Sequence, residues 1–244
     1  MMRVLSTIPF TMLRLARNYI VLILLLLVPI VLLTFFSLIL SGMKTEDGTP
    51  YSDYNALTMV LVFQLFGGTT VMHFIHIDLF TVNRMRMFAL PFNKTMYAFS
   101  IMMCGTLFSV VLGILLMTYS QFVLGVAWHS WGWVIYLISL MSLLSSIVCV
   151  IFASLVKNYK LAERLSEIYG VGFVLLAGLF FPMPKNGLFD FLGSYGNPLT
   201  LAIRSVTDRS RGNLSEAWFQ ANILLAAIVI LFIVMLVAGR RRMR

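Results

Sequence analysis

Long apolar stretches without charged side chains constrain this chain more than any other feature of its sequence. Five of them lie at about 19–41, 56–77, 97–124, 131–156 and 217–239. A helix rises about 1.5 Å per residue, so roughly 20 apolar residues cross a hydrocarbon layer of about 30 Å. With 60% hydrophobic and only 11% charged residues, the chain could not solvate the surface of a soluble domain. The sequence therefore predicts an all-α integral membrane protein.

The stretch from 166 to 206 departs from this pattern. Its apolar run, 168–181, has about 14 residues, which as a helix would cover only about 21 Å. Pro182 and Pro184 then stop a helix, and a second break follows at Asn197-Pro198. The pattern favours a sixth span at 166–182, followed by a broken, half-inserted hairpin over 183–206. Such irregular backbone must lie where protein or water satisfies its polar groups.

The N-terminal segment 3–18 has polar side chains at helical spacing, among them Thr11 and Arg14, with apolar side chains largely on the other side. This pattern predicts an interfacial helix on the membrane surface. The alternative is a plain basic flank of the first span.

The basic residues are distributed unevenly along the chain. Thirteen of the 18 Lys and Arg residues fall in the segment 3–18, the loops 79–95 and 157–167, and the tail after 239, which a six-span layout places on one side. The positive-inside rule therefore predicts that both termini are cytoplasmic. This distribution is a signal of topology and of contact with anionic membrane lipid, and it argues against nucleic acid as a partner.

Eight residues form a pattern around the broken hairpin: Gly178, Phe180, Phe181, Pro182, Asn197, Pro198, Leu199 and Thr200, ahead of the last span. This pattern resembles the signature region of ABC-2 type permeases, the membrane subunits of one class of ABC exporters. The resemblance implies two short re-entrant helices on the outer side, between spans five and six. It also implies an outer gate formed by Phe180, Phe181, Pro182, Asn197 and Pro198.

The loop 79–95 mixes basic and apolar side chains before Pro91, a pattern that allows a short amphipathic helix. It resembles the first cytoplasmic loop of ABC-2 permeases, where a coupling helix sits in a cleft of the ATPase. The segment 3–18 resembles the elbow helix of that family, which also lines the ATPase. The resemblance implies a set of ATPase-coupling residues, namely Arg84, Arg86, Met87, Phe88, Leu90 and Arg14. The alternative is an ordinary positive-inside loop.

The second span carries small or hydrogen-bonding residues that favour close packing of helices. Three of them, Gln64, Thr69 and Thr70, are predicted to line a transport path. His73 and His76 share a face near the inner end of this span. Two histidines with Asp78 nearby fall short of a full set of metal ligands, so hydrogen bonding between helices is favoured over a metal site.

Two absences in the sequence bear on the energy source. The spans hold almost no ionisable side chain at mid-depth, and the chain contains no G-x4-G-K-[ST] phosphate loop. We therefore expect energy to come from a separate ATPase subunit that binds ATP and Mg²⁺. No catalytic residue, metal or cofactor is predicted in this chain.

The sequence thus predicts a single transmembrane domain over 1–244 that acts as the permease subunit of an ABC exporter in a cell membrane, expected to be the plasma membrane of a bacterium. Its expected partners are cytoplasmic ABC ATPase subunits, a second identical or similar permease, membrane lipid and an exported substrate. The predicted path is also lined by apolar side chains, which suits an amphipathic or hydrophobic substrate such as a peptide, a drug or a lipid-like molecule. The alternative is a small channel or a membrane assembly factor that works without an ATPase. A membrane-embedded enzyme would need paired carboxylates or a metal cluster at depth, which the sequence lacks.

Overall fold

The computed structural model describes residues 8–40, 42–43, 50–81, 83, 85, 89, 94–156, 158–179 and 186–242, without the side chains of 188–190, 241 and 242. Every regular element within these residues is a helix. In the part of the chain that the structure describes, five helical segments are long and apolar enough to cross a membrane: Tyr19–Ile39, Tyr51–Phe80, Lys94–Leu124, Trp131–Leu155 and Leu214–Arg240. Each overlaps one of the predicted spans. The prediction of an all-helical membrane protein is confirmed.

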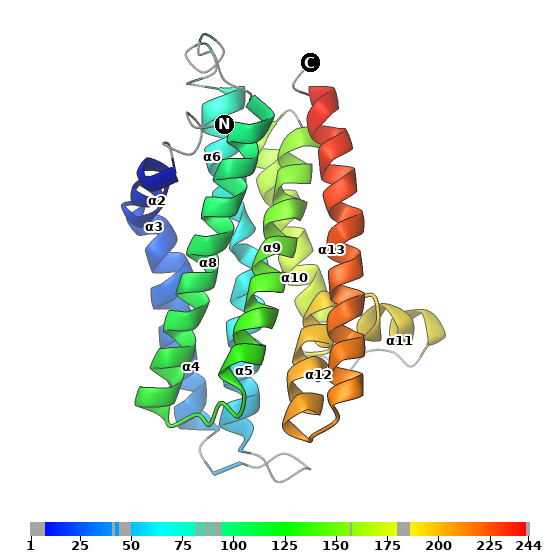
Figure 1. Ribbon diagram of the computed structural model, residues 1–244. Coiled ribbons are helices and arrows are strands. Elements are labelled where there is room, and N and C mark those ends of the chain that lie inside the picture. The colour runs from blue at the N-terminus through cyan, green and yellow to red at the C-terminus, as the bar shows by residue number, and fades with distance from the viewer. Residues whose placement is uncertain are drawn as a thin grey trace.

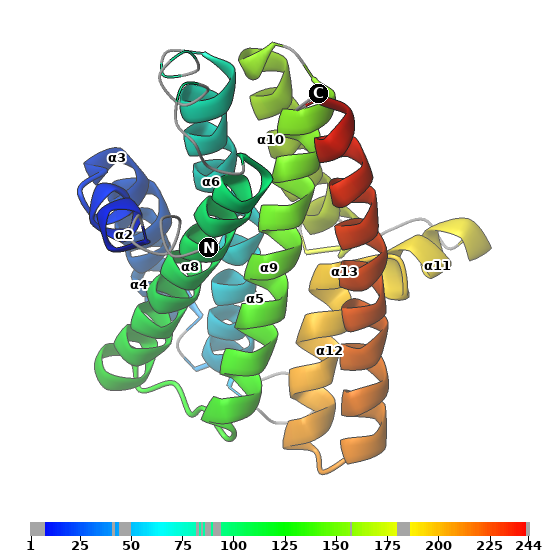
Figure 2. The same cartoon turned by 45° about the horizontal axis from the view of Figure 1, so that its top comes forward.

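Helix α9 (Trp131–Leu155) lies at the centre of the bundle (Figures 1 and 2). Its main neighbours include α5 (Tyr51–Phe66), α6 (Gly68–Ile75), α8 (Lys94–Leu124) and α13 (Leu214–Arg242). Ser142, Ser145 and Ser146 of α9 are fully buried. Small side chains let helix backbones approach closely in a membrane, where no hydrophobic force between helices assists packing.

The first span is built from three consecutive pieces, α3 (Tyr19–Leu22), the π-helix η1 (Ile23–Leu27) and α4 (Val28–Ile39). Pro29 lies at the start of α4 and has no N–H to donate to the turn before it, which accounts for a change of helix type at this point. The Thr34 hydroxyl lies 2.6 Å from the Tyr119 hydroxyl, so a hydrogen bond joins α4 to α8.

The second span is also composite. Helix α5 ends at Phe66, Gly67 is a turn residue, and α6 continues into a second π-helix, η2 (His76–Phe80). Position 68 requires glycine, because a Cβ there would overlap the backbone of Ser145 in α9. The Gly68 amide donates a hydrogen bond to Ser145 Oγ at 3.0 Å.

The region after α9 differs in its boundaries from the predicted fifth span. Helix α10 runs over Tyr159–Leu176 rather than 166–182, so most of the predicted charged loop 157–167 is helical. The reason is the capping residue Asn158, whose side chain accepts a hydrogen bond from the Lys160 amide at 3.0 Å. The charged side chains in the first two turns of α10 therefore lie on the surface of a helix.

Helix α10 descends to about the middle of the bundle, α11 (Gly187–Ser194) projects sideways, and α12 (Pro198–Ser210) continues to the opposite end (Figure 1). A short turn then leads into α13, which runs back along the full height. The short helix α2 (Ile8–Ala16), η2 and the last turn of α13 lie together at one end, which we call the α2 end. The other end, where α12 meets α13, is called the α12 end.

Candidate functional site

The most concentrated polar structure at the α2 end surrounds Asp78, which lies in η2 and is 2% exposed. Its two carboxylate oxygens accept hydrogen bonds from the guanidinium of Arg14 in α2, with Nη1 3.2 Å from Oδ1 and Nη2 2.7 Å from Oδ2. A guanidinium presents its N–H groups as a planar fork, so the two bonds fix direction as well as distance. Arg14 also lies over the ring of Phe74, with Cζ 4.1 Å from the ring centroid.

Two further donors complete the surroundings of Asp78. The Tyr97 hydroxyl, from the first turns of α8, donates to Oδ2 at 3.0 Å, and Asn83 Nδ2 donates to Oδ1 at 3.2 Å. A buried carboxylate is tolerated only when it is paired and hydrogen-bonded, and here four donor atoms from three side chains converge on it. We call Arg14, Asp78, Asn83 and Tyr97 the Asp78 junction. It joins α2, the end of the second span and the start of the third.

Near this junction, the second span also contacts α10, through His73 and His76. His73 Nδ1 lies 3.1 Å from the Tyr159 hydroxyl at the start of α10, and the His76 ring packs on the Tyr159 ring at a centroid distance of 4.7 Å. These contacts are the interhelical bonding that the sequence favours for the two histidines. Among the described residues, no group of three or more His, Cys, Asp or Glu side chains could hold a metal ion.

The orientation of α2 explains its part in the junction. Thr11 and Leu15 are buried against the bundle, whereas Phe10 and Leu13 are exposed at 74% and 56%. The polar face of the helix, which carries Thr11 and Arg14, therefore packs onto protein, and large apolar side chains face outward. This arrangement suits an interfacial helix whose outer side meets lipid.

The predicted path residues lie in the middle of the second span. Gln64 is 2% exposed, and its Oε1 accepts hydrogen bonds from Ser109 Oγ at 2.9 Å and Ser142 Oγ at 2.6 Å. Thr69 donates to the Phe66 carbonyl at 2.7 Å, and Thr70 is buried with no hydrogen-bond partner for its hydroxyl. Gln64 thus ties α5 to α8 and α9 within this subunit. Their assignment to a transport path stays a prediction.

The predicted outer gate is described in part. Asn197 is fully buried, its Oδ1 accepts a hydrogen bond from the Leu199 amide at 3.0 Å, and its Nδ2 donates to the Phe173 carbonyl of α10 at 2.8 Å. Pro198 occupies the first turn of α12, where the missing N–H has no cost. One asparagine therefore caps α12 and fastens it to α10. Phe180, Phe181 and Pro182 lie outside the described residues.

The other predicted coupling residues, Arg84, Arg86, Met87, Phe88 and Leu90, also lie outside the described residues. Of that set, the structure places only Arg14. Sequence reasoning did not identify Tyr97 and Asn83 as partners of Asp78. A signal was present, because an acidic residue at the end of a span whose flanking loop is basic needs a cation, and Arg14 lies on the polar face of a predicted helix.

A bundle of helices that includes five long, apolar segments defines the class as a multi-span α-helical membrane protein. A model of the family described as ABC-2 type transporter matches residues 5–208 of the chain. This protein belongs to that family, and it is a membrane-embedded permease component of an ABC transporter. Neither the curated proteins nor the solved structures contain a match to it.

Proposed function

We propose that this chain is the permease subunit of an ATP-driven exporter, working with separate cytoplasmic ATPase subunits that bind ATP and Mg²⁺ and with a second permease. Membership of the ABC-2 family and the absence of a phosphate loop from the sequence support the separate ATPase. The cargo we propose is amphipathic or hydrophobic, because the described spans offer few charged groups at depth.

The layout we propose has six crossings, with α2 as an interfacial elbow helix. Five crossings are the long helices, and the sixth is shared between α10 and α12, which meet near mid-height through the bond from Asn197 to the Phe173 carbonyl. Helix α11 and the first part of α12 would be the re-entrant outer helices. The excess of basic residues in segments near the α2 end supports a cytoplasmic location for this end and for both termini, in the plasma membrane of a bacterium.

The observation that carries the proposal is the Asp78 junction. It connects the elbow helix to η2 immediately before the segment 82–93, where the ATPase-coupling residues are predicted. A push on that segment or on α2 would reach η2 through Asn83 or Arg14. It would then pass to α10 through His73 and His76, both in contact with Tyr159. The two π-helical segments are places where a helix can change register, and such segments are frequent at functional sites.

The test is co-expression of the chain with its cognate ABC ATPase, followed by purification in mild detergent and reconstitution. We expect the ATPase subunit to co-purify. The double reversal Arg84→Glu/Arg86→Glu should reduce ATP turnover and cargo transport at least ten-fold, and Arg211→Glu at the α12 end is the matched control. If no nucleotide-binding subunit associates, or if the purified chain moves cargo without ATP, the protein is a channel or assembly factor and the proposal fails.

A further inference from the structure

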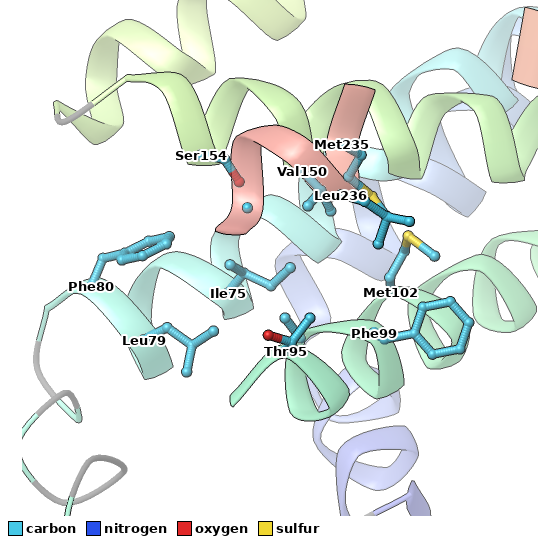
Figure 3. A pocket seen from close by; sticks show the side chains of 12 residues that line it. Ile75, Leu79, Phe80, Thr95, Phe99, Met102, Val150, Ser154, Met235 and Leu236 are labelled. Carbon is cyan, nitrogen blue, oxygen red and sulfur yellow. The ribbon is translucent and has the colours of Figure 1, made fainter. Parts of the chain in front are cut away.

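A narrow crevice lies between four helices at the α2 end (Figure 3). Its floor is formed by α9, with Val150 and Ser154. Its walls come from η2 and α8 on one side and from α13 on the other, where Leu236 and Gly239 line it. Of the lining side chains, only Thr95 and Ser154 carry a hydroxyl, and the remainder are apolar. The crevice has a volume of about 50 Å³.

The crevice follows from how α13 packs. This helix lies mainly against α9 and α12 and has few direct contacts with α8. Nearer the middle of the bundle, the rings of Phe99 in α8 and Phe232 in α13 meet edge to face, with centroids 6.3 Å apart. The lining residue Phe99 of α8 is large, apolar and 45% exposed. Hydrocarbon chains of a bilayer can therefore reach the crevice beside Phe99, and water is a poor occupant because the walls offer it few polar partners.

Positive charge is concentrated beside the same crevice. Arg240 is exposed and directly follows the lining residue Gly239, and the sequence continues with Arg241 and Arg242. Lys94 directly precedes the lining residue Thr95 in the first turn of α8. In the orientation proposed above, these side chains lie at the depth of the headgroups of the cytoplasmic leaflet. Basic groups beside a pocket between spans on that side of a membrane are an arrangement that binds phospholipid headgroups.

We propose that this crevice binds an anionic phospholipid of the cytoplasmic leaflet, with one acyl chain between α8 and α13 and with its phosphate held by Arg240 and Lys94. The acyl chain would pack against Leu79, the neighbour of Asp78 in η2. Binding would therefore hold η2 in the conformation that forms the Asp78 junction. The inference rests on the proposed orientation but not on ATP-driven transport.

The binding test uses the full chain in nanodiscs of phosphatidylcholine, with Phe80→Trp as a reporter in the crevice wall. The titrants are phosphatidylglycerol and phosphatidylcholine, each brominated in one acyl chain so that it quenches a nearby tryptophan. The native tryptophans at 128, 131, 133 and 218 lie before or in the first turns of α9 and in the first turns of α13, at the α12 end, and the signal of the parent chain corrects for them. We expect half-maximal quenching at a several-fold lower fraction of phosphatidylglycerol than of phosphatidylcholine.

Two variants distinguish recognition of the lipid headgroup from binding of the acyl chain. Arg240→Gln should weaken the preference for phosphatidylglycerol by roughly five-fold, as expected for one basic group near an anionic headgroup, whereas Arg211→Gln should leave it unchanged. Ala98→Leu fills the crevice and should abolish reporter quenching by both lipids. Monodisperse elution confirms that each variant is folded.

Three results would overturn the proposal. Equal quenching by both lipids means bulk lipid without headgroup recognition. Quenching that persists in Ala98→Leu means that the acyl chain lies elsewhere. No quenching by either lipid means that a protein segment covers the crevice. Neither nucleotide nor ATPase enters this experiment, so its failure leaves the exporter proposal standing, and failure of the exporter proposal leaves the binding result standing.

Discussion

At the scale of single residues, Asp78 is the side chain on which the candidate site depends most. Asp78→Asn keeps the volume but removes the charge that Arg14 faces. A hydrogen bond to a charged group contributes about 1.5–3 kcal/mol, and the Arg14 side chain keeps 40% of its surface accessible, so it recovers part of that by solvation. We expect the free energy of unfolding to fall by about 1–2 kcal/mol, which lowers Tm by roughly 2–8 °C in detergent.

Cysteine labelling can distinguish a local release of α2 in Asp78→Asn from a general loss of stability. Thr11 is 7% exposed because α2 is docked, so Thr11→Cys should react slowly with a maleimide. In the Asp78→Asn background we expect its labelling to be several-fold faster. Arg17→Gln is the matched control, since Arg17 is exposed just beyond the same helix. If Asp78→Asn and Arg17→Gln behave alike in both measurements, the junction does not hold α2 in place.

Gly68 gives a second residue-level prediction, because its hydrogen atom is what allows α6 to touch α9. Gly68→Ala would push a Cβ into the Ser145 backbone, which cannot move aside as a flexible side chain would. Overpacking of this kind costs about 1–3 kcal/mol. Gly132→Ala is the control, since no atom lies within 4 Å of a Cβ built there. Thermal unfolding should show a loss of several degrees for Gly68→Ala and none for Gly132→Ala.

The sequence located the apolar spans well but not the contacts between them, and single residues show why. Hydropathy is a property of each stretch, so the positions of the spans follow from composition. The pair of Arg14 and Asp78 joins residues 64 positions apart, and no periodicity encodes that meeting. Gln64 was predicted from polarity alone as a path residue. The same polarity also serves to join α5 to α8 and α9, and sequence does not distinguish the two uses.

At the scale of elements, the arrangement of α10, α11 and α12 depends on the hydrogen bond that holds α12 to α10. Asn197→Ala removes both the cap of α12 and the bond to the Phe173 carbonyl, and it should cost about 1–3 kcal/mol. Asn197→Asp keeps an acceptor for the Leu199 amide but loses the donor to Phe173. We therefore expect both variants to be destabilised in thermal unfolding. The loss in Asn197→Asp combines the missing bond to the Phe173 carbonyl with the cost of a carboxyl group buried against it.

The control for this pair is Asn186→Ala. Asn186 precedes α11 and makes no side-chain capping bond, so its loss should change Tm by less than about 1 °C. A stable Asn197→Asp would show that the cap alone matters and that α10 and α12 are held together by other contacts.

Elements were predicted unevenly for a physical reason. The break at Asn197-Pro198 was visible in sequence, because proline restricts the backbone whatever surrounds it. The start of α10 was placed too late, because charged residues in 157–167 were interpreted as a loop. Charged residues near a membrane surface indicate that a segment is exposed to water. An exposed helix capped by Asn158 fits this signal as well as an exposed loop does. The π-helix η2 has no local sequence signal comparable to the proline that follows η1.

At the scale of the whole molecule, the two ends of the bundle differ in what they present. The α2 end carries the Asp78 junction and the basic tail of α13. The α12 end is held by a network around Trp133, whose Nε1 donates to Ser205 Oγ at 3.2 Å, while Ser205 Oγ donates to the Ala217 carbonyl at 2.9 Å. The exporter mechanism requires the first end to face the ATPase and the second to face outward.

Single-cysteine labelling of intact cells tests that orientation. Lys160→Cys lies at the start of α10, near the α2 end, and Asn213→Cys lies in the turn between α12 and α13; both positions are exposed. The native Cys104 and Cys149 are 2% and 0% exposed, so they should add little background. A membrane-impermeant maleimide should label Asn213→Cys in intact cells and Lys160→Cys only after lysis. Labelling of Lys160→Cys in intact cells would place the Asp78 junction on the side without ATP, and an ATPase docked there could not then be the energy source.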